Sequence, residues 1–285
     1  MAANEQNKLA APVPWAHLRL PPFPQVAVRI LQLVSNENVQ LRQLCDLIST
    51  DPAFASEVLM VANSAFYCPR YPSTSISQAV AVIGATRLQG ICVTVGVRSY
   101  LGKAMKLPAM RNLWRHNLAC AIIAHLLPTP HSIDRDMAYT SGILHDLGRM
   151  ALAVLHPATY AELLESHRGT SSSILEAERS LFGWDHCEVG RQLIADWNLP
   201  ATFEAVIADH LSAPRADSAW DAGDLVRLSC ALASTVGFAA FPGCEPLPYS
   251  GLLEELPAGE RGLFAFDADG LRGQVAEKIQ AVEAA

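Results

Sequence analysis

The sequence predicts an all-α protein. Apolar residues recur at spacings of three and four in most segments of the chain, which places them on one face of a helix. Several of these segments open with a helix start signal and close at Gly or Pro. The chain has 285 residues, of which 51% are hydrophobic, so it can bury a large core. We expect an N-terminal helical bundle packed on a C-terminal one, with the boundary near residues 102–110.

The N-terminal bundle is predicted over residues 18–104, after a flexible lead-in at residues 1–17 that is polar and rich in Ala and Pro. Residues 20–24 contain three prolines and should be extended, because proline fixes its own φ and disfavours helix in the residue before it. Helices are then expected at residues 26–34 and 41–48, from the spacing of their apolar residues.

The next two helices have clear start signals. Asp51 is suited to cap a third helix that has Pro52 at its first position. A fourth should open at residues 74–76 and end at Gly84. Residues 88–101 are rich in β-branched side chains, and residues 91–95 alone could be a strand. No partner strand is evident nearby, so we predict a buried helix there.

The second bundle is predicted over residues 105–285. One helix should run from about residue 110 to Pro128, and another without interruption from residue 135 to residue 155. Capping boxes are predicted from two spacings of three residues, Ser173 with Glu176 and Asp185 with Glu188. Further helices are expected at residues 202–210, 225–233 and 271–284. Residues 241–270 are dense in Pro and Gly and should be irregular.

Charge and cysteine usage limit the function classes. A net charge of −7 makes nucleic acid or an anionic membrane a disfavoured partner. One local basic run is interpreted as the solvated face of one or two helices. It comprises Arg98, Lys103, Lys106, Arg111 and Arg115. No signal peptide or membrane span is visible, and the seven scattered cysteines, never spaced as CxxC, suit reduced thiols. We therefore expect a cytoplasmic protein.

The adjacent pair His145-Asp146 is the main candidate for a functional site. An imidazole and a carboxylate on one turn can both bind a divalent metal if other helices bring more ligands. His116, His186 and His210 lie on other predicted helices, and the helix dipole should keep the ring of His186 neutral. The alternative is structural: Asp146 pairs with Arg149, and His145 is a hydrogen-bonded core residue.

No other catalytic motif competes with this pair. The sequence has neither a Gly-rich phosphate loop nor a GxSxG elbow. Cys92, Cys120 and Cys230 lie among apolar residues and are most simply core thiols.

These features resemble the HD-related output domain (HDOD) family over residues 18–211. The matching segments are residues 20–26, 48–53, 59–67, 76–80, 83–84, 113–116, 145–149, 176–178, 186–190 and 197–200. The resemblance implies an N-terminal bundle packed on a bundle related to HD-type phosphohydrolases. It also implies a bacterial regulatory protein, often coupled to cyclic dinucleotide signalling, with a catalytic site that is commonly eroded.

The resemblance also implies a metal ligand set, which this chain meets in part. Three members of the HD set map onto His116, His145 and Asp146. A later aspartate is expected where this chain has Ser229-Cys230. The Gly-Tyr-Pro motif of cyclic-di-GMP phosphodiesterases does not follow His210, and the paired His-His of that group reads Asp209-His210 here.

We therefore predict a non-catalytic signalling protein that binds a protein partner or a small, nucleotide-derived effector; a homodimer is compatible with this. The alternative is a metal-dependent phosphohydrolase or phosphodiesterase in which His145 and Asp146 act in catalysis, with His116 as a further ligand. The prediction requires no cofactor, but the partial site suits Fe, Zn or Mn. His186 and His210 could serve a second ion, and a Cys230 thiolate would favour Zn or Fe.

Overall fold

The computed structural model describes residues 20, 22–34, 41–67, 69–130, 133–168, 173–212, 220–244 and 246–285. These residues form α-helices and short 3-10 turns without a strand, which confirms the all-α prediction. The N-terminal helices are α1 (Gln25–Val34), α2 (Leu41–Ser49), α3 (Pro52–Ala62), α4 (Ile76–Ile83) and α5 (Ala85–Leu101). The middle of the chain forms α6 (Pro108–Leu126), α7 (Arg135–Leu144), α8 (Leu147–Leu155), α9 (Pro157–Ser166) and α10 (Ser173–Phe182). The remaining helices are α11 (His186–Asp196), α12 (Ala201–Asp209), α13 (Ala222–Thr235), α14 (Tyr249–Glu254) and α15 (Ala268–Glu283).

The predicted helix starts in the N-terminal half are confirmed. One carboxylate oxygen of Asp51 accepts the N–H groups of Ala53 and Phe54, at 3.0 and 3.1 Å, ahead of Pro52. Ser75 caps α4. Gly84 ends it with a φ of +87°, a conformation that glycine adopts without a Cβ clash.

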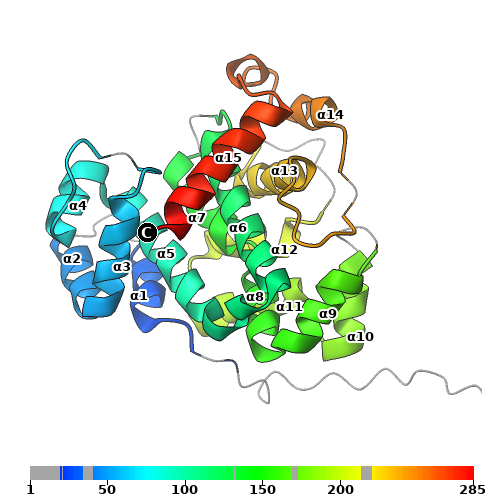
Figure 1. Cartoon of the computed structure of the whole chain (residues 1–285), viewed down its shortest axis with the longest axis horizontal. Coiled ribbons are helices and arrows are strands. Elements are labelled where there is room, and N and C mark those ends of the chain that lie inside the picture. Colours follow the sequence, from blue (N-terminus) through cyan, green and yellow to red (C-terminus); the bar gives the residue numbers. More distant parts are fainter. Residues whose placement is uncertain are drawn as a thin grey trace, which may run out of the picture.

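Helix α5 connects the two halves of the molecule, as Figure 1 shows. It packs against α1, α3 and α4 on one side and against α7 and α8 on the other. Most residues of α5 are buried, and apolar residues occur on all sides of the helix. Its sequence therefore lacks the one-sided apolar spacing by which a surface helix is recognised. Its Thr94 hydroxyl forms a 2.9 Å hydrogen bond with the hydroxyl of Tyr139 on α7. The prediction of a helix rather than a strand here is confirmed.

Helix α6 is the central helix of the C-terminal half. It packs against α7, α13 and α15, and its whole middle stretch is buried. Arg115 on α6 forms a two-pronged ion pair with Glu283 on α15, at 2.7 and 2.8 Å. Arg98, in turn, pairs with Glu57 at 3.3 Å. Part of the predicted basic face is therefore paired rather than solely solvated.

The uninterrupted helix predicted over residues 135–155 is wrong. Helix α7 ends at Leu144, and α8 begins at Leu147, so His145 and Asp146 lie in a break. The backbone of Asp146 leaves the helical region, with φ −97° and ψ 23°. The sequence prediction also omitted α9, which begins at Pro157, directly after α8. His156, with φ −129°, separates these two helices.

Other helix boundaries also differ from the prediction. Part of the segment predicted to be irregular is helical, namely α14 and a 3-10 turn at Arg261–Leu263. Helix α13 starts earlier than expected, because Asp221 and Asp224 form a capping box. The box at Asp185 and Glu188 is confirmed. Ser173 is the first residue of α10 rather than its cap, and the residues before it lie outside the described ones.

Buried apolar side chains form one connected core from Phe23 to Val282. The boundary near residues 102–110 stays a prediction, and the proposed lead-in at residues 1–17 lies outside the described residues. Among the helices that the structure describes, none combines the length and the apolar character needed to cross a membrane.

Candidate functional site

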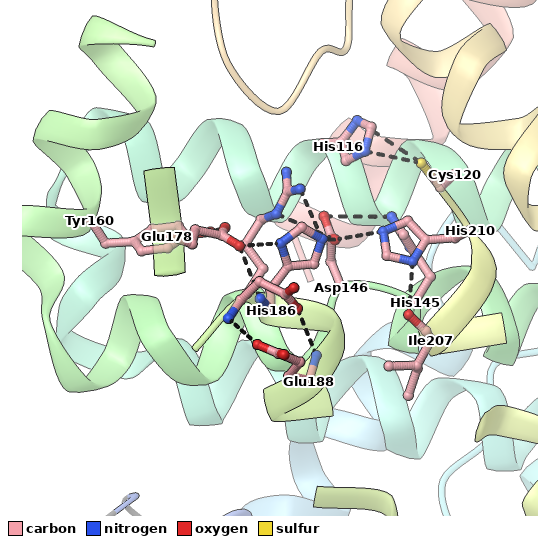
Figure 2. A network of polar contacts seen from close by, with 12 residues as sticks. His116, Cys120, His145, Asp146, Tyr160, Glu178, His186, Glu188, Ile207 and His210 are labelled. Atoms are coloured by element: carbon pink, nitrogen blue, oxygen red, sulfur yellow. Dashed lines mark hydrogen bonds and ion pairs between the residues drawn. The ribbon is translucent and has the colours of Figure 1, made fainter. Parts of the chain in front are cut away.

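Asp146 lies at the centre of a buried polar cluster, which is formed by the break between α7 and α8 and by the helices around it (Figure 2). One of its oxygens lies 3.3 Å from His210 Nε2 and 3.7 Å from His186 Nε2. The other lies 3.5 Å from His145 Nε2. His116 on α6 contacts His145, with ring centroids 5.6 Å apart. The structure thus brings together all four predicted histidines and Asp146.

Backbone carbonyls orient three of these imidazoles. The Nδ1 atoms of His116 and His145 each lie 2.7 Å from a carbonyl oxygen, of Phe238 and Gly142 respectively. His210 Nδ1 lies 3.0 Å from the carbonyl of Ile207. Because a carbonyl only accepts, Nδ1 carries a hydrogen in each ring, and Nε2 faces the cluster to hold a proton or a metal. Metal-binding histidines commonly show this arrangement.

The predicted pairing of Asp146 with Arg149 is also present. Arg149 Nε lies 3.4 Å from the Asp146 carboxylate, and both side chains are buried. Burial raises the pKa of Asp146, but Arg149 and the surrounding histidines together lower it by more, so it lies well below the usual value. The structure therefore shows the pairing that the structural interpretation expects, and it also places Asp146 among the histidines of the cluster.

Glu178 on α10 is a member of the site that the sequence-based reasoning missed. Its carboxylate accepts hydrogen bonds from the Tyr160 hydroxyl at 2.5 Å and from the N–H of His186 at 2.9 Å. It also accepts from Nδ1 of His186 at 2.6 Å. The available signal was a charged residue in a buried stripe, since Ile174, Glu178 and Phe182 share one face of α10.

Glu178 also controls the ring of His186. Burial and Arg149 lower the pKa of His186, but Glu178 and a hydrogen bond to Cys187 together raise it by more. The lowering expected from the helix dipole is therefore wrong in direction. Arg149 Nη2 lies 3.2 Å from His186 Nε2, and a guanidinium can only donate. This contact favours the neutral ring, in which Nε2 accepts, so Arg149 opposes the rise in the pKa of His186 that Glu178 causes.

Two thiols complete the cluster on the side of His116. Cys120 Sγ lies 3.5 Å from His116 Nε2. Figure 2 marks this contact with a dashed line. One ligand atom from each of His116, Cys120, His145 and Cys230 lies within 4.8 Å of the other three. The Ser229 hydroxyl instead donates a hydrogen bond to the carbonyl of Leu225 within its own helix, so Cys230 is the residue that faces the site.

Cys120 and Cys230 are buried free thiols in the core, as predicted, but they also lie against His116 and His145. Burial raises the pKa of Cys230, but hydrogen bonding to Cys120 and the charge of His145 lower it well below the usual value. The pKa of Cys120 is raised, first by burial and then by Cys230. Cys92 matches the prediction for a core thiol, because burial alone raises its pKa.

A cavity of about 680 Å³ opens over this cluster. Three arginines, Arg149, Arg168 and Arg227, lie along its wall. Apolar side chains, among them Phe241 and Leu247, line another part of it. A cavity with these walls can hold a small molecule that has both an anionic group and an apolar part.

Comparison with known proteins assigns the family. The profile of the HDOD domain matches residues 20–213, more than half of the chain. The chain belongs to the HDOD family. This HDOD chain is also 28% identical over 240 residues to an uncharacterized protein of Treponema pallidum. That alignment covers 83% of this chain and 44% of the relative, so the HDOD chain spans less than half of the relative's length.

Solved structures confirm the HDOD fold. One is an HDOD domain protein of unknown function from Geobacter sulfurreducens, with 24% identity and a TM-score of 0.66 over 93% of this chain and 91% of that one. Another, from Shewanella amazonensis SB2B, is provisionally named a phosphohydrolase. It shows 21% identity and a TM-score of 0.66 over 93% and 94% of the two chains. A third, from Marinobacter aquaeolei VT8 and provisionally named a signal transduction protein, has 22% identity and a TM-score of 0.63 over 94% of this chain and 58% of that one.

The residues of this HDOD site fit a metal ion in more than one way. His145, Asp146 and His210 each offer a ligand atom within 4.8 Å of the other two. The ligand atoms of a second group, His116, Cys120, His145 and Cys230, also lie within 4.8 Å of one another. Nε2 of His145 and both carboxylate oxygens of Asp146 lack a hydrogen-bond partner among the described residues. Buried polar atoms left in this state are expected where an ion or a water binds.

Proposed function

We propose that this HDOD protein is a non-catalytic signalling protein that binds a small anionic effector in the cavity over the histidine cluster. The observation that carries the proposal is Cys230. Its thiol faces His116 and His145, where the resemblance to HD phosphohydrolases calls for a carboxylate. Binding of a signalling protein partner, and a homodimer, stay predictions from the sequence.

The chemistry of the cavity wall supports an anionic effector. Arginine suits phosphate and carboxylate groups, because its planar guanidinium donates two parallel hydrogen bonds. Arg168 lies at the cavity and is exposed, and its Nη1 donates to the carbonyls of Glu165 and His167. The volume of about 680 Å³ lies within the range of about 300–1,000 Å³ that is usual for small-molecule sites. A nucleotide or a nucleotide-derived molecule fits this description.

The same cluster is poorly suited to phosphoryl hydrolysis. Mg²⁺ and Mn²⁺ prefer oxygen ligands, whereas Cys230 offers sulfur. The Asp146 carboxylate, which a catalytic metal would need, is already paired with the buried Arg149. Both features favour binding over catalysis.

A metal-dependent phosphohydrolase is the second candidate, and a specific observation favours it. His145, Asp146 and His210 can offer three ligand atoms to one ion. In that case Asp146 and His145 would act in catalysis by holding the ion that activates water. A metal-dependent phosphohydrolase is also the provisional name of a Shewanella amazonensis SB2B structure, which shares 20% identity and a TM-score of 0.60 with this chain.

One pair of assays separates the two functions. Binding of GMP, GTP and cyclic di-GMP is measured by calorimetry, and hydrolysis of the same compounds is followed by chromatography with Mg²⁺, Mn²⁺ or Fe²⁺ added. We expect one of the three to bind without turnover. Arg168→Ala should weaken that binding about tenfold, equivalent to about 1.4 kcal/mol. Arg191→Ala removes an exposed arginine of α11, away from the cavity wall, and should leave it unchanged.

Two results would contradict the proposal. Turnover that disappears in Asp146→Asn would identify a hydrolase. The absence of binding by all three compounds to the folded protein would remove the effector site as described.

A further inference from the structure

Two imidazoles and two thiols meet where α6, the α7–α8 break and α13 come together. His116 and Cys120 lie four residues apart on α6, so they share one face of that helix. His145 comes from the break, and Cys230 comes from α13. All four side chains are buried, with exposed fractions between 0% and 9%. The sequence does not reveal this group, because its members are scattered from residue 116 to residue 230.

The spacing of these atoms suits a tetrahedral metal ion. With Zn–S of about 2.3 Å and Zn–N of about 2.0–2.1 Å, a tetrahedral site separates a sulfur from a nitrogen by about 3.6 Å. Cys120 Sγ and His116 Nε2 are 3.5 Å apart. No two of the four ligand atoms are more than 4.8 Å apart, so these side chains need to move together only slightly to bind one ion.

The surroundings of the two histidines also match a metal site. The carbonyls of Phe238 and Gly142 hold Nδ1 of His116 and His145, so that Nε2 of each faces inward. His145 Nε2 is buried and has no hydrogen-bond partner among the described residues. It points at Asp146 from 3.5 Å, yet no hydrogen bond forms there. A metal ligand is the simplest role for this nitrogen.

We propose that His116, Cys120, His145 and Cys230 bind one Zn²⁺ ion in a closed, four-coordinate site. Two sulfur and two nitrogen ligands form one of the common sets of structural zinc sites, and such a set leaves no position for a catalytic water. Binding releases the thiol protons, and it also releases any proton on the ligating Nε2 atoms. Asp146 is then not a ligand and stays with Arg149.

The site would link three parts of the chain that are remote in sequence. Zinc would hold α6, the α7–α8 break and α13 together and so stabilise the floor of the cavity. His116, His145 and Cys230 line the cavity, but Cys120 does not. The zinc proposal does not depend on the effector, since a structural zinc can be present whether or not the cavity binds a nucleotide.

Metal content tests the proposal directly. The full chain is purified without chelators in a non-thiol reductant, and metals are quantified by plasma mass spectrometry. We expect about one zinc per chain. Cys120→Ala and Cys230→Ala should each lose most of the zinc, whereas Cys92→Ala, which removes another buried free thiol, should retain it. Asp146→Asn should also retain the zinc, since the carboxylate is not among the four ligands.

Cobalt substitution gives a readout that needs no variant. In the wild-type protein, Co²⁺ bound by two thiolates should produce intense sulfur-to-metal charge-transfer absorption in the near ultraviolet. The cysteine variants, once circular dichroism has shown that they are folded, should show this absorption weakened or absent.

Three results would overturn the proposal: a reduced, folded wild-type chain that neither contains nor binds zinc; Co²⁺ binding without charge-transfer absorption; and metal that is lost in Asp146→Asn but retained in Cys120→Ala. The last result would place the ion at the carboxylate instead. Nucleotide binding without zinc would overturn the zinc site and leave the proposed function standing. Zinc binding without nucleotide binding would overturn the effector site and leave the zinc site standing.

Discussion

Asp146 shows how a buried charge is accommodated in this protein. A carboxylate without a partner is costly inside a protein, yet Asp146 is 1% exposed. Arg149 neutralises it from three residues further along the chain, and His210 and His145 surround it. Because both Asp146 and Arg149 are buried, removing either one would leave the other as an unpaired buried charge.

Glu178 plays the corresponding role for His186, and its contribution can be measured. Glu178→Ala leaves the Tyr160 hydroxyl and two N–H groups of His186 without their acceptor. We expect a loss of about 3–5 kcal/mol in the free energy of unfolding, measured by urea denaturation. Glu176→Ala, an exposed change on the same helix, should cost less than about 0.5 kcal/mol. Equal losses in the two variants would contradict the importance of the buried network.

At the scale of helices, the break between α7 and α8 produces the site. A continuous helix would keep successive side chains about 100° apart around one axis. The break instead directs His145 and Asp146 toward α6, α11 and α13. Gly148 accounts for the path of α8, because its Cα lies against the backbone of α11 at His186 and Gly190. Gly142 also lies close to α6, where an added Cβ would come within 2.6 Å of Ala121 Cα.

Substitution of Gly148 tests this close approach. In Gly148→Ala the new methyl group would overlap the carbonyl oxygen of His186 and lie 2.5 Å from the nitrogen of Gly190. Backbone cannot give way as a flexible side chain can, so we expect a loss of more than about 3 kcal/mol, or failure to fold. Gly273→Ala on α15 meets no atom within 4 Å and should instead gain up to about 1 kcal/mol from helix propensity. Thermal unfolding of both variants checks this, and a stable Gly148→Ala would contradict the assigned contact.

At the scale of the molecule, the two predicted bundles share α5 and a connected core. Trp197, at the end of α11, adds a second link. Its ring lies 5.0 Å from that of Phe23 and 6.5 Å from that of Tyr100, between centroids. Gln32 on α1 donates to its carbonyl oxygen at 2.7 Å. The helix that carries His186 therefore contacts the N-terminal helices at its other end.

Loss of this ring should loosen α1 selectively. Trp197→Ala removes a partly buried aromatic contact, so we expect a cost of about 2–3 kcal/mol, below the range for a fully buried Trp. Amide hydrogen exchange should accelerate in α1 and remain slow in α13. Trp184→Ala, at a partly exposed position before α11, is the matched control and should leave α1 unchanged. Uniform acceleration across the chain would contradict a local role for Trp197.

Local signals made much of the fold predictable. Capping residues such as Asp51, Ser75 and Asp185 act on backbone groups two or three positions away, so the sequence alone locates the helices that they start. The break at His145-Asp146 could not be read in the same way. Leu and Gly around it favour helix or allow it, and the close contact of Gly148 with α11 fixes the path of α8.

The sequence by itself determined the all-α class, the HDOD family, the four histidines and Asp146 as candidates, and the thiol at position 230. Tertiary structure decided that these residues meet and that Glu178 and Cys120 belong to the same cluster. The physical reason is range. Helix caps depend on neighbours along the chain, whereas ligand geometry depends on how helices separated by tens of residues pack, and a buried Glu or Cys reveals its partners only after that packing is known.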